Sequence, residues 1–200
     1  MKMNPVNQQV ELLQAMLSIN KLILHEDDSG ILMQKVCELL SDLTGALCSL
    51  IVEFDRDGHY FRAFNAQFNA DYLPLVPYLE DGGELKCAKL AIETNSVVVI
   101  VNTQIIPGKN VKNSTVTFPI FFQEKNFGFI TVFTAAPSIY CENNLKIFFE
   151  IGECLGFSQL RLNCEAKLKK VIKALEESTE RLKEAQSLAL VGGWELDIET

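Results

Sequence analysis

The sequence is poor in the residues that metal sites and disulfide frameworks require. It has two histidines, His25 and His59, and six cysteines, none of them in a C-x-x-C pair. These spacings offer no ligand set for a structural zinc ion. Most of the cysteines lie among apolar residues, which is typical of reduced thiols packed as small hydrophobic side chains. We therefore expect no metal, no disulfides and a cytoplasmic location.

Basic residues and long apolar runs are also scarce. The chain has 18 lysine and arginine residues against 26 acidic ones, a formal net charge of -8. A nucleic-acid surface needs a concentrated basic patch, and the lysines between residues 167 and 173 are surrounded by glutamates. The purest apolar run, residues 97–101, is too short to cross a bilayer, and the N-terminus shows no signal peptide. We expect neither nucleic-acid binding nor membrane contact by this segment.

The longest periodic segment runs from about residue 140 to residue 189. Its first half repeats apolar residues at helical spacing, as in a helix that packs on a folded domain. Its second half has a seven-residue repeat with charged residues at most other positions, the pattern of a coiled coil. One helix is thus predicted to begin in a globular core and to end in a parallel dimeric coiled coil. The seam of that coiled coil would contain Leu168, Val171, Leu175, Leu182 and Ala185.

The N-terminal segment predicts a helix with two packing surfaces, one for its own domain and one for a partner. Residues 6–24 carry an apolar stripe that is wider than packing on one domain requires. Such a stripe suits a helix held between its own domain and a partner, with Leu13 and Leu17 on the partner side. We expect a homodimer that forms through these terminal helices.

Strands and short helices alternate in the middle of the chain. A helix capped by Asp28 or Ser29 is followed by a predicted hairpin of residues 48–55 and 60–64. Mixed signals up to residue 83 predict a short helix and loops. Residues 84–94 then predict a helix, and residues 97–101 predict a buried strand.

A second hairpin follows, formed by residues 115–122 and 126–134. Both of its faces are apolar, with Phe118 and Phe122 on one face and Phe121 on the other. A sheet that buries both faces must be covered on both sides. The sequence therefore predicts an α+β fold: an antiparallel sheet with long N- and C-terminal helices on one face and short helices and loops on the other.

This order of elements resembles a GAF domain. SGILMQKVCELL (29–40) is similar to the second helix of that family, and NLKIFFE (144–150) is similar to its last helix. TFPIFF (117–122) with FGFITV (127–132) is similar to its late hairpin. The resemblance spans roughly residues 20–165, and it implies a sensor fold and not one particular ligand.

The end of the chain resembles a second family. EAQSLALVGGWELD (184–197) is similar to the start of a PAS domain. GAF, coiled coil and PAS in this order imply a bacterial signalling protein, such as a two-component sensor, that ends in a histidine kinase or a cyclic-di-GMP enzyme. The expected parts are an N-terminal dimerisation helix (1–25), a GAF-like sensor domain (26–160), a coiled-coil signalling linker (161–188) and the truncated start of a PAS domain (189–200).

The resemblance leaves the cofactor or ligand unknown. The N-K…F…D-E signature of cyclic-nucleotide-binding members is absent, no cysteine precedes a histidine as in bilin-binding members, and neither histidine is placed as a haem ligand. The family implies a pocket on the sheet face opposite the long helices. A closed core could use the same side chains, so both readings stay open. Candidates to line the pocket are Phe64, Phe68, Tyr72, Tyr78, Cys87, Thr103 and Thr117.

Together, these patterns and resemblances predict a regulatory sensor. It would bind a small molecule and pass the signal through a dimeric coiled-coil helix to PAS and output domains. One alternative is a ligandless GAF module that serves as a dimerisation spacer. A second is a cysteine-based small-molecule reductase centred on Cys87, because some family members reduce free methionine sulfoxide. Reduction needs a low-pKa thiolate and a resolving thiol, and the sequence supports neither. We expect no catalytic activity from this segment.

Overall fold

The computed structural model describes residues 5–43, 46–55, 57–68, 75–104, 112–134 and 142–196. Side chains are described within these ranges except at residues 5–8, 102–104, 112–113 and 189–196. The chain divides into two compact units, Met1–Leu160 and Arg161–Thr200. The elements in chain order are α1 (Pro5–His25), α2 (Ser29–Ser41), β1 (Ala46–Phe54), β2 (Tyr60–Ala66), α3 (Leu75–Glu80), α4 (Lys86–Thr94), β3 (Val98–Gln104), β4 (Lys112–Phe122), β5 (Lys125–Thr134) and α5 (Glu142–Leu196).

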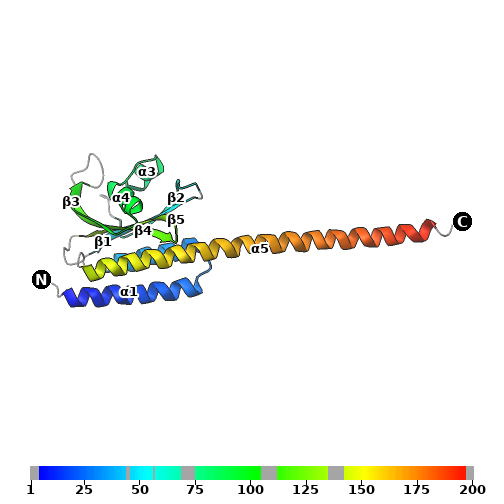
Figure 1. Ribbon diagram of the computed structural model, residues 1–200, viewed down its shortest axis with the longest axis horizontal. Helices are drawn as coiled ribbons and strands as arrows, with labels where there is room; N and C mark the ends of the chain where they lie inside the picture. Colours follow the sequence, from blue (N-terminus) through cyan, green and yellow to red (C-terminus); the bar gives the residue numbers. More distant parts are fainter. Residues whose placement is uncertain are drawn as a thin grey trace. The chain divides into compact units, whose positions relative to one another are not determined.

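The first unit is built around a five-stranded sheet in the order β2-β1-β5-β4-β3. All neighbouring strands are antiparallel. Helices α1, α2 and the first part of α5 lie on one side of the sheet, and α3 and α4 lie on the other (Figure 1). The structure confirms the predicted α+β fold, with long helices on one face and short helices on the other.

Local sequence signals explain the helix boundaries near the N-terminus. Asp28 caps α2, and its carboxylate accepts a hydrogen bond from the backbone N–H of Ile31 at 2.9 Å. Of the two caps that the sequence allowed, Asp28 is the one used, which leaves the Ser29 hydroxyl available for a different contact. Helix α1 buries one face, formed by Leu12, Ala15, Ile19 and Ile23, and leaves the opposite face in solvent.

Two features of the sheet differ from the prediction. Strand β3 is an edge strand and not a buried one: its apolar residues are half-buried, and Val101 is 58% exposed. Phe121 does not lie opposite Phe118. An irregularity in the pairing of β4 with β5 between Ile120 and Phe121 shifts the register, and the Phe121 ring packs on Phe149 of α5 at 4.9 Å.

Close packing joins α5 to β4. The ring of Phe148 packs on Phe118 with centroids 5.2 Å apart. At Gly152 and Gly156 an added Cβ atom would lie 2.2 Å and 2.1 Å from the carbonyl oxygens of Pro119 and Phe121. Only glycine permits this approach, so these two positions fix the helix directly against the strand.

Candidate functional site

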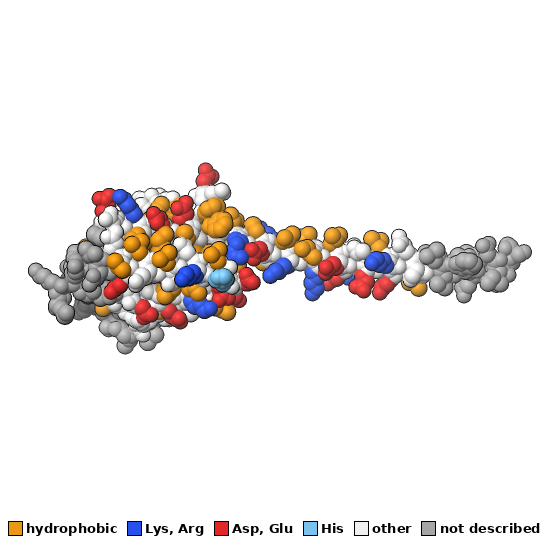
Figure 2. Space-filling view, turned by 90° about the horizontal axis from the view of Figure 1, so that it is seen from below, with side chains coloured by type: hydrophobic (Ala, Val, Ile, Leu, Met, Phe, Trp, Pro, Cys, Tyr) orange, Lys and Arg blue, Asp and Glu red, His pale blue; other side chains and the backbone are white. Residues whose placement is uncertain are grey.

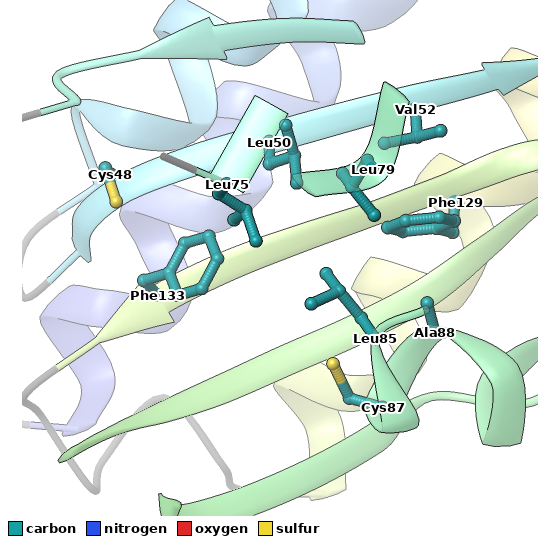
Figure 3. Packing of buried hydrophobic residues seen from close by; sticks show 10 residues of the cluster. All are labelled: Cys48, Leu50, Val52, Leu75, Leu79, Leu85, Cys87, Ala88, Phe129 and Phe133. Carbon is teal, nitrogen blue, oxygen red and sulfur yellow. The ribbon is translucent and has the colours of Figure 1, made fainter. Parts of the chain in front are cut away.

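A hydrophobic cluster fills the space between the sheet and helices α3 and α4. Side chains from β1 and β5 point toward Leu75 and Leu79 of α3 and toward the start of α4 (Figure 3). The cluster is tightly buried, with most members less than 6% exposed. Its members are Cys48, Leu50, Val52, Leu75, Leu79, Leu85, Cys87, Ala88, Phe129 and Phe133.

The structure brings four of the predicted pocket residues to this face. Cys87 belongs to the cluster and is 6% exposed, and Phe68 and Tyr78 pack against the cluster. The buried Thr117 hydroxyl is hydrogen-bonded to that of Thr131 at 3.0 Å. Thr131 shares its face of β5 with Phe129 and Phe133, so Thr117 also lies on the cluster face.

Of the other three candidates, the structure describes the side chain of Phe64 alone, and it lies away from the cluster. Phe64 is paired with Ile51 and therefore lies on the sheet face that carries the long helices. Its ring lies 5.0 Å from the guanidinium carbon of Arg62. Tyr72 and the side chain of Thr103 lie outside the described residues. The role of the seven candidates as ligand contacts stays a prediction.

An open groove lies beside the cluster, between the β1–β2 hairpin, the α3–α4 loop and α4. Its volume is about 620 Å³, within the range of small-molecule sites in proteins. The floor is apolar, and charged or polar side chains stand at the edges. The residues that line it are Val52, Phe54, Gly58, His59, Tyr60, Leu79, Glu80, Gly82, Gly83, Glu84, Leu85, Ala88, Lys89, Ile92, Glu93 and Phe129.

The α3–α4 loop is shaped by two glycines. Gly82 adopts a φ of +83°, and its N–H and that of Gly83 donate to the carbonyls of Leu79 and Tyr78 at 3.0 and 2.8 Å. This pattern ends α3 in a tight C-terminal turn that favours glycine. At Gly83 an added Cβ would lie 2.5 Å from the Tyr78 side chain. The glycine pair therefore places Glu84 at the rim of the groove.

A short polar turn between β1 and β2 forms the wall of the groove that faces the α3–α4 loop and α4. One Asp55 carboxylate oxygen accepts hydrogen bonds from the backbone N–H groups of Asp57 and His59, each at 2.9 Å. The bond from His59 is the main reason that the pKa of Asp55 lies below its ordinary value. This turn places His59 and Tyr60 beside the groove.

A buried polar network lies on the face of β1 that is turned away from the groove. Glu53 is 5% exposed and accepts hydrogen bonds from Ser29 at 3.1 Å and from the Gln159 amide at 2.6 Å. Its second oxygen is paired with the guanidinium of Arg62. Arg62 and Gln159 also donate to the Ser29 hydroxyl, at 2.9 and 2.7 Å. This network, hereafter the Glu53 network, joins α2, β1, β2 and α5.

The cysteine chemistry bears on the reductase alternative. Burial raises the pKa of Cys37 to about 12 and that of Cys48 to about 12. At neutral pH both groups are therefore thiols and not the thiolates that reduction requires. Burial also raises the pKa of Cys154. Five cysteines are described, and all five are free thiols. Within the described ranges no three His, Cys, Asp or Glu residues come together as a metal-binding group.

Comparison with known proteins gives a fold and no closer assignment. No family model matches the sequence, and no curated protein matches it. Among solved structures, the GAF domain of a phosphoenolpyruvate-protein phosphotransferase from Coxiella burnetii superposes with a TM-score of 0.60 at 15% identity, covering 80% of this chain and 98% of that one. The corresponding GAF domain from Acinetobacter gives 0.57 at 15% identity, covering 76% and 94%.

An enzyme shares the same fold. Free methionine-R-sulfoxide reductase from Neisseria meningitidis, in complex with its substrate, superposes with a TM-score of 0.56 at 13% identity, covering 78% of this chain and 91% of that one. At such identities the likeness establishes the fold alone. The first unit therefore has the fold of GAF domains, which these structures show both in phosphotransferases and in a reductase.

None of the described helices has the length and apolar character that a membrane crossing demands.

Proposed function

We propose that the chain is a regulatory sensor module in which a small molecule occupies the groove and changes the state of helix α5. One observation carries this proposal. Val52 and Phe54 of β1 line the groove, and Glu53 between them is hydrogen-bonded to Gln159 of α5 through the sheet's other face. Because successive side chains of a strand point to opposite faces, a shift of β1 at the groove also moves the Glu53 network.

The proposal includes dimerisation through the terminal helices, which is supported by apolar side chains exposed on both of them. Leu13 and Leu17 on the outer face of α1 are 42% and 62% exposed. In the second unit the heptad residues Leu168, Val171, Leu175 and Leu182 are each at least 60% exposed, and Ala185 is exposed as well. Figure 2 shows apolar side chains exposed on the first unit and, separately, apolar side chains spaced along the helix of the second. A second copy of the chain would bury both sets of residues.

The signal would leave through α5 toward later domains. Residues 161–188 would act as the coiled-coil linker, and residues 189–200 would begin a PAS domain ahead of a kinase or cyclic-di-GMP output. The backbone is helical through Leu196. In this proposal the small residues Ser178 and Ala185 weaken the seam, so the pair of helices could change register or rotate in response to modest energies.

A thermal-shift screen tests whether the groove binds a ligand. The chain would be screened against small metabolites, nucleotides, aromatic acids and amines, and each hit would be repeated on Ile92→Trp. Because Ile92 lines the groove and is half-buried, tryptophan at this position should fill the groove and abolish the shift. A ligand present at 100 times its Kd should stabilise the wild type by about 2.7 kcal/mol.

A matched control lies on the same helix. Leu90 is 46% exposed and does not line the groove, so Leu90→Trp should keep the full shift. If no compound shifts a protein that is already a stable dimer, the proposal fails in favour of the spacer. Reduction of free methionine sulfoxide that is lost in Cys87→Ser would instead favour the reductase.

A further inference from the structure

We infer that the groove takes a small organic ammonium ion with an apolar body, and this inference rests on the sensor function proposed above. The three features that point to this ligand are the apolar floor of the groove, the excess of carboxylates at its rim and the aromatic side chains among its lining residues.

The floor of the groove suits an apolar group about the size of one phenyl ring. Leu79, Leu85, Ala88 and Ile92 line it from the helical side, and Phe129 lines it from the sheet. Leu79, Leu85, Ala88 and Phe129 are each no more than 5% exposed. Small-molecule sites are typically apolar with a few polar groups that set orientation and specificity. The polar groups at the rim therefore determine which ligand can bind.

The rim carries more negative charge than positive. Three carboxylates, Glu80, Glu84 and Glu93, face one ammonium group, that of Lys89. Lys89 pairs with Glu84 at 3.4 Å, which leaves Glu80 and Glu93 without a lysine or arginine partner among the described residues. His59 lies 3.8 Å from Asp55. A ligand carboxylate would be repelled at this rim, whereas an ammonium group would find up to two carboxylates that lack a lysine or arginine partner among the described residues.

Tyr60 adds a hydroxyl and an aromatic ring to the same rim. Its hydroxyl donates to a Glu80 carboxylate oxygen at 3.4 Å. Burial and the negative charge of Glu80 raise the pKa of Tyr60, so the phenol stays a neutral donor. Phe54 and Phe129 also line the groove, and their rings pack on each other with centroids 6.0 Å apart. Aromatic faces beside carboxylates favour organic ammonium ions through cation–π attraction.

Three ligands of one size and different charge test this inference. The whole 200-residue chain would be titrated calorimetrically with 2-phenylethylammonium, with the neutral 2-phenylethanol and with the anionic phenylacetate, at low and high salt. We expect the ammonium ion to bind at least tenfold more tightly than the alcohol, and phenylacetate to bind most weakly. The preference for the ammonium ion should shrink as added salt screens the rim.

Removing a negative charge and removing a positive charge at the rim should change the affinity for the ammonium ion in opposite directions. Glu93→Gln should weaken ammonium binding by about three- to tenfold, and Lys89→Gln should strengthen it by a similar factor. Ile92→Trp should abolish binding, whereas Glu176→Gln, an exposed site in the second unit, should leave it unchanged.

Each opposing outcome has a definite meaning. Equal binding of the alcohol, tighter binding of phenylacetate, or an unchanged affinity in both Glu93→Gln and Lys89→Gln would overturn the ammonium assignment. If one of those ligands still loses binding in Ile92→Trp, the sensor proposal survives while the ligand class is wrong. Failure of all three ligands to bind at millimolar concentration also overturns the inference. Binding of the ammonium ion without any change in α5 would instead contradict the sensor proposal alone.

Discussion

Replacing Arg62 by leucine is expected to lower the free energy of unfolding by about 3 kcal/mol, because it leaves the Glu53 carboxylate buried without its countercharge. Glu53 keeps the hydrogen bonds from Ser29 and Gln159, but neither of these neutral groups supplies the lost positive charge. The 37% exposure of the Arg62 side chain keeps the loss below that of a fully buried pair. Urea unfolding followed by circular dichroism measures the change at neutral pH.

The double variant separates the charge from the packing. Glu53→Leu together with Arg62→Leu removes both charges, and we expect it to recover much of the stability lost in Arg62→Leu alone. Arg181→Leu, at an exposed position of the second unit, serves as the control and should change stability by less than about 0.5 kcal/mol. A loss in Arg62→Leu no larger than in this control would show that the Glu53 network does not stabilise the fold.

We expect that replacing Leu175 by lysine converts the proposed dimer into a monomer. Leu175 is 66% exposed and occupies the central heptad position between Leu168 and Leu182. In a parallel pair, two lysines would face each other across the seam, so like-charge repulsion would add to the loss of apolar burial. Size-exclusion chromatography with light scattering should then give the mass of one chain, where the wild type gives that of two.

The control changes charge away from the seam. Glu180 lies on the outer side of the same heptad, and Glu180→Lys should remain dimeric. A wild-type protein that stays monomeric at high concentration would contradict dimerisation altogether. A Leu175→Lys variant that stays dimeric would place the dimer contact on α1, and Leu17→Lys would then be the variant to examine.

Much of the fold follows from the sequence because its signals are local. Helical periodicity predicts α1 and α5, and runs of β-branched and aromatic residues predict the two hairpins. Asp28, a residue type that favours the N-cap position, marks the start of α2. The edge position of β3 could not be read in this way, because strand order depends on pairings between distant segments. The position of Phe121 depends on a register irregularity that alternation of residues does not reveal.

The groove could be predicted only in part. The family resemblance implies a pocket on the sheet face opposite the long helices, the face beside which the groove lies. The residues predicted to line it include Phe68 and Cys87, which pack in or against the closed cluster. Glu80, Lys89 and Glu93 were missed because charged residues on short helices usually mark a solvated face. Gly82 and Gly83 were the available signal, since a glycine pair marks a sharp turn, but the direction of that turn comes only from the structure.

Hydrogen exchange along α5 is the measurement that tests the central claim most directly. Saturating the groove with 2-phenylethylammonium should change the exchange of α5 backbone amides around Gln159 as well as those of α4. In Gln159→Leu, which keeps the groove intact but breaks the link to Glu53, α4 should still respond and α5 should not. A wild-type protein whose α4 responds while α5 is unchanged would contradict the account, because its groove would bind a ligand without passing a signal to the helix.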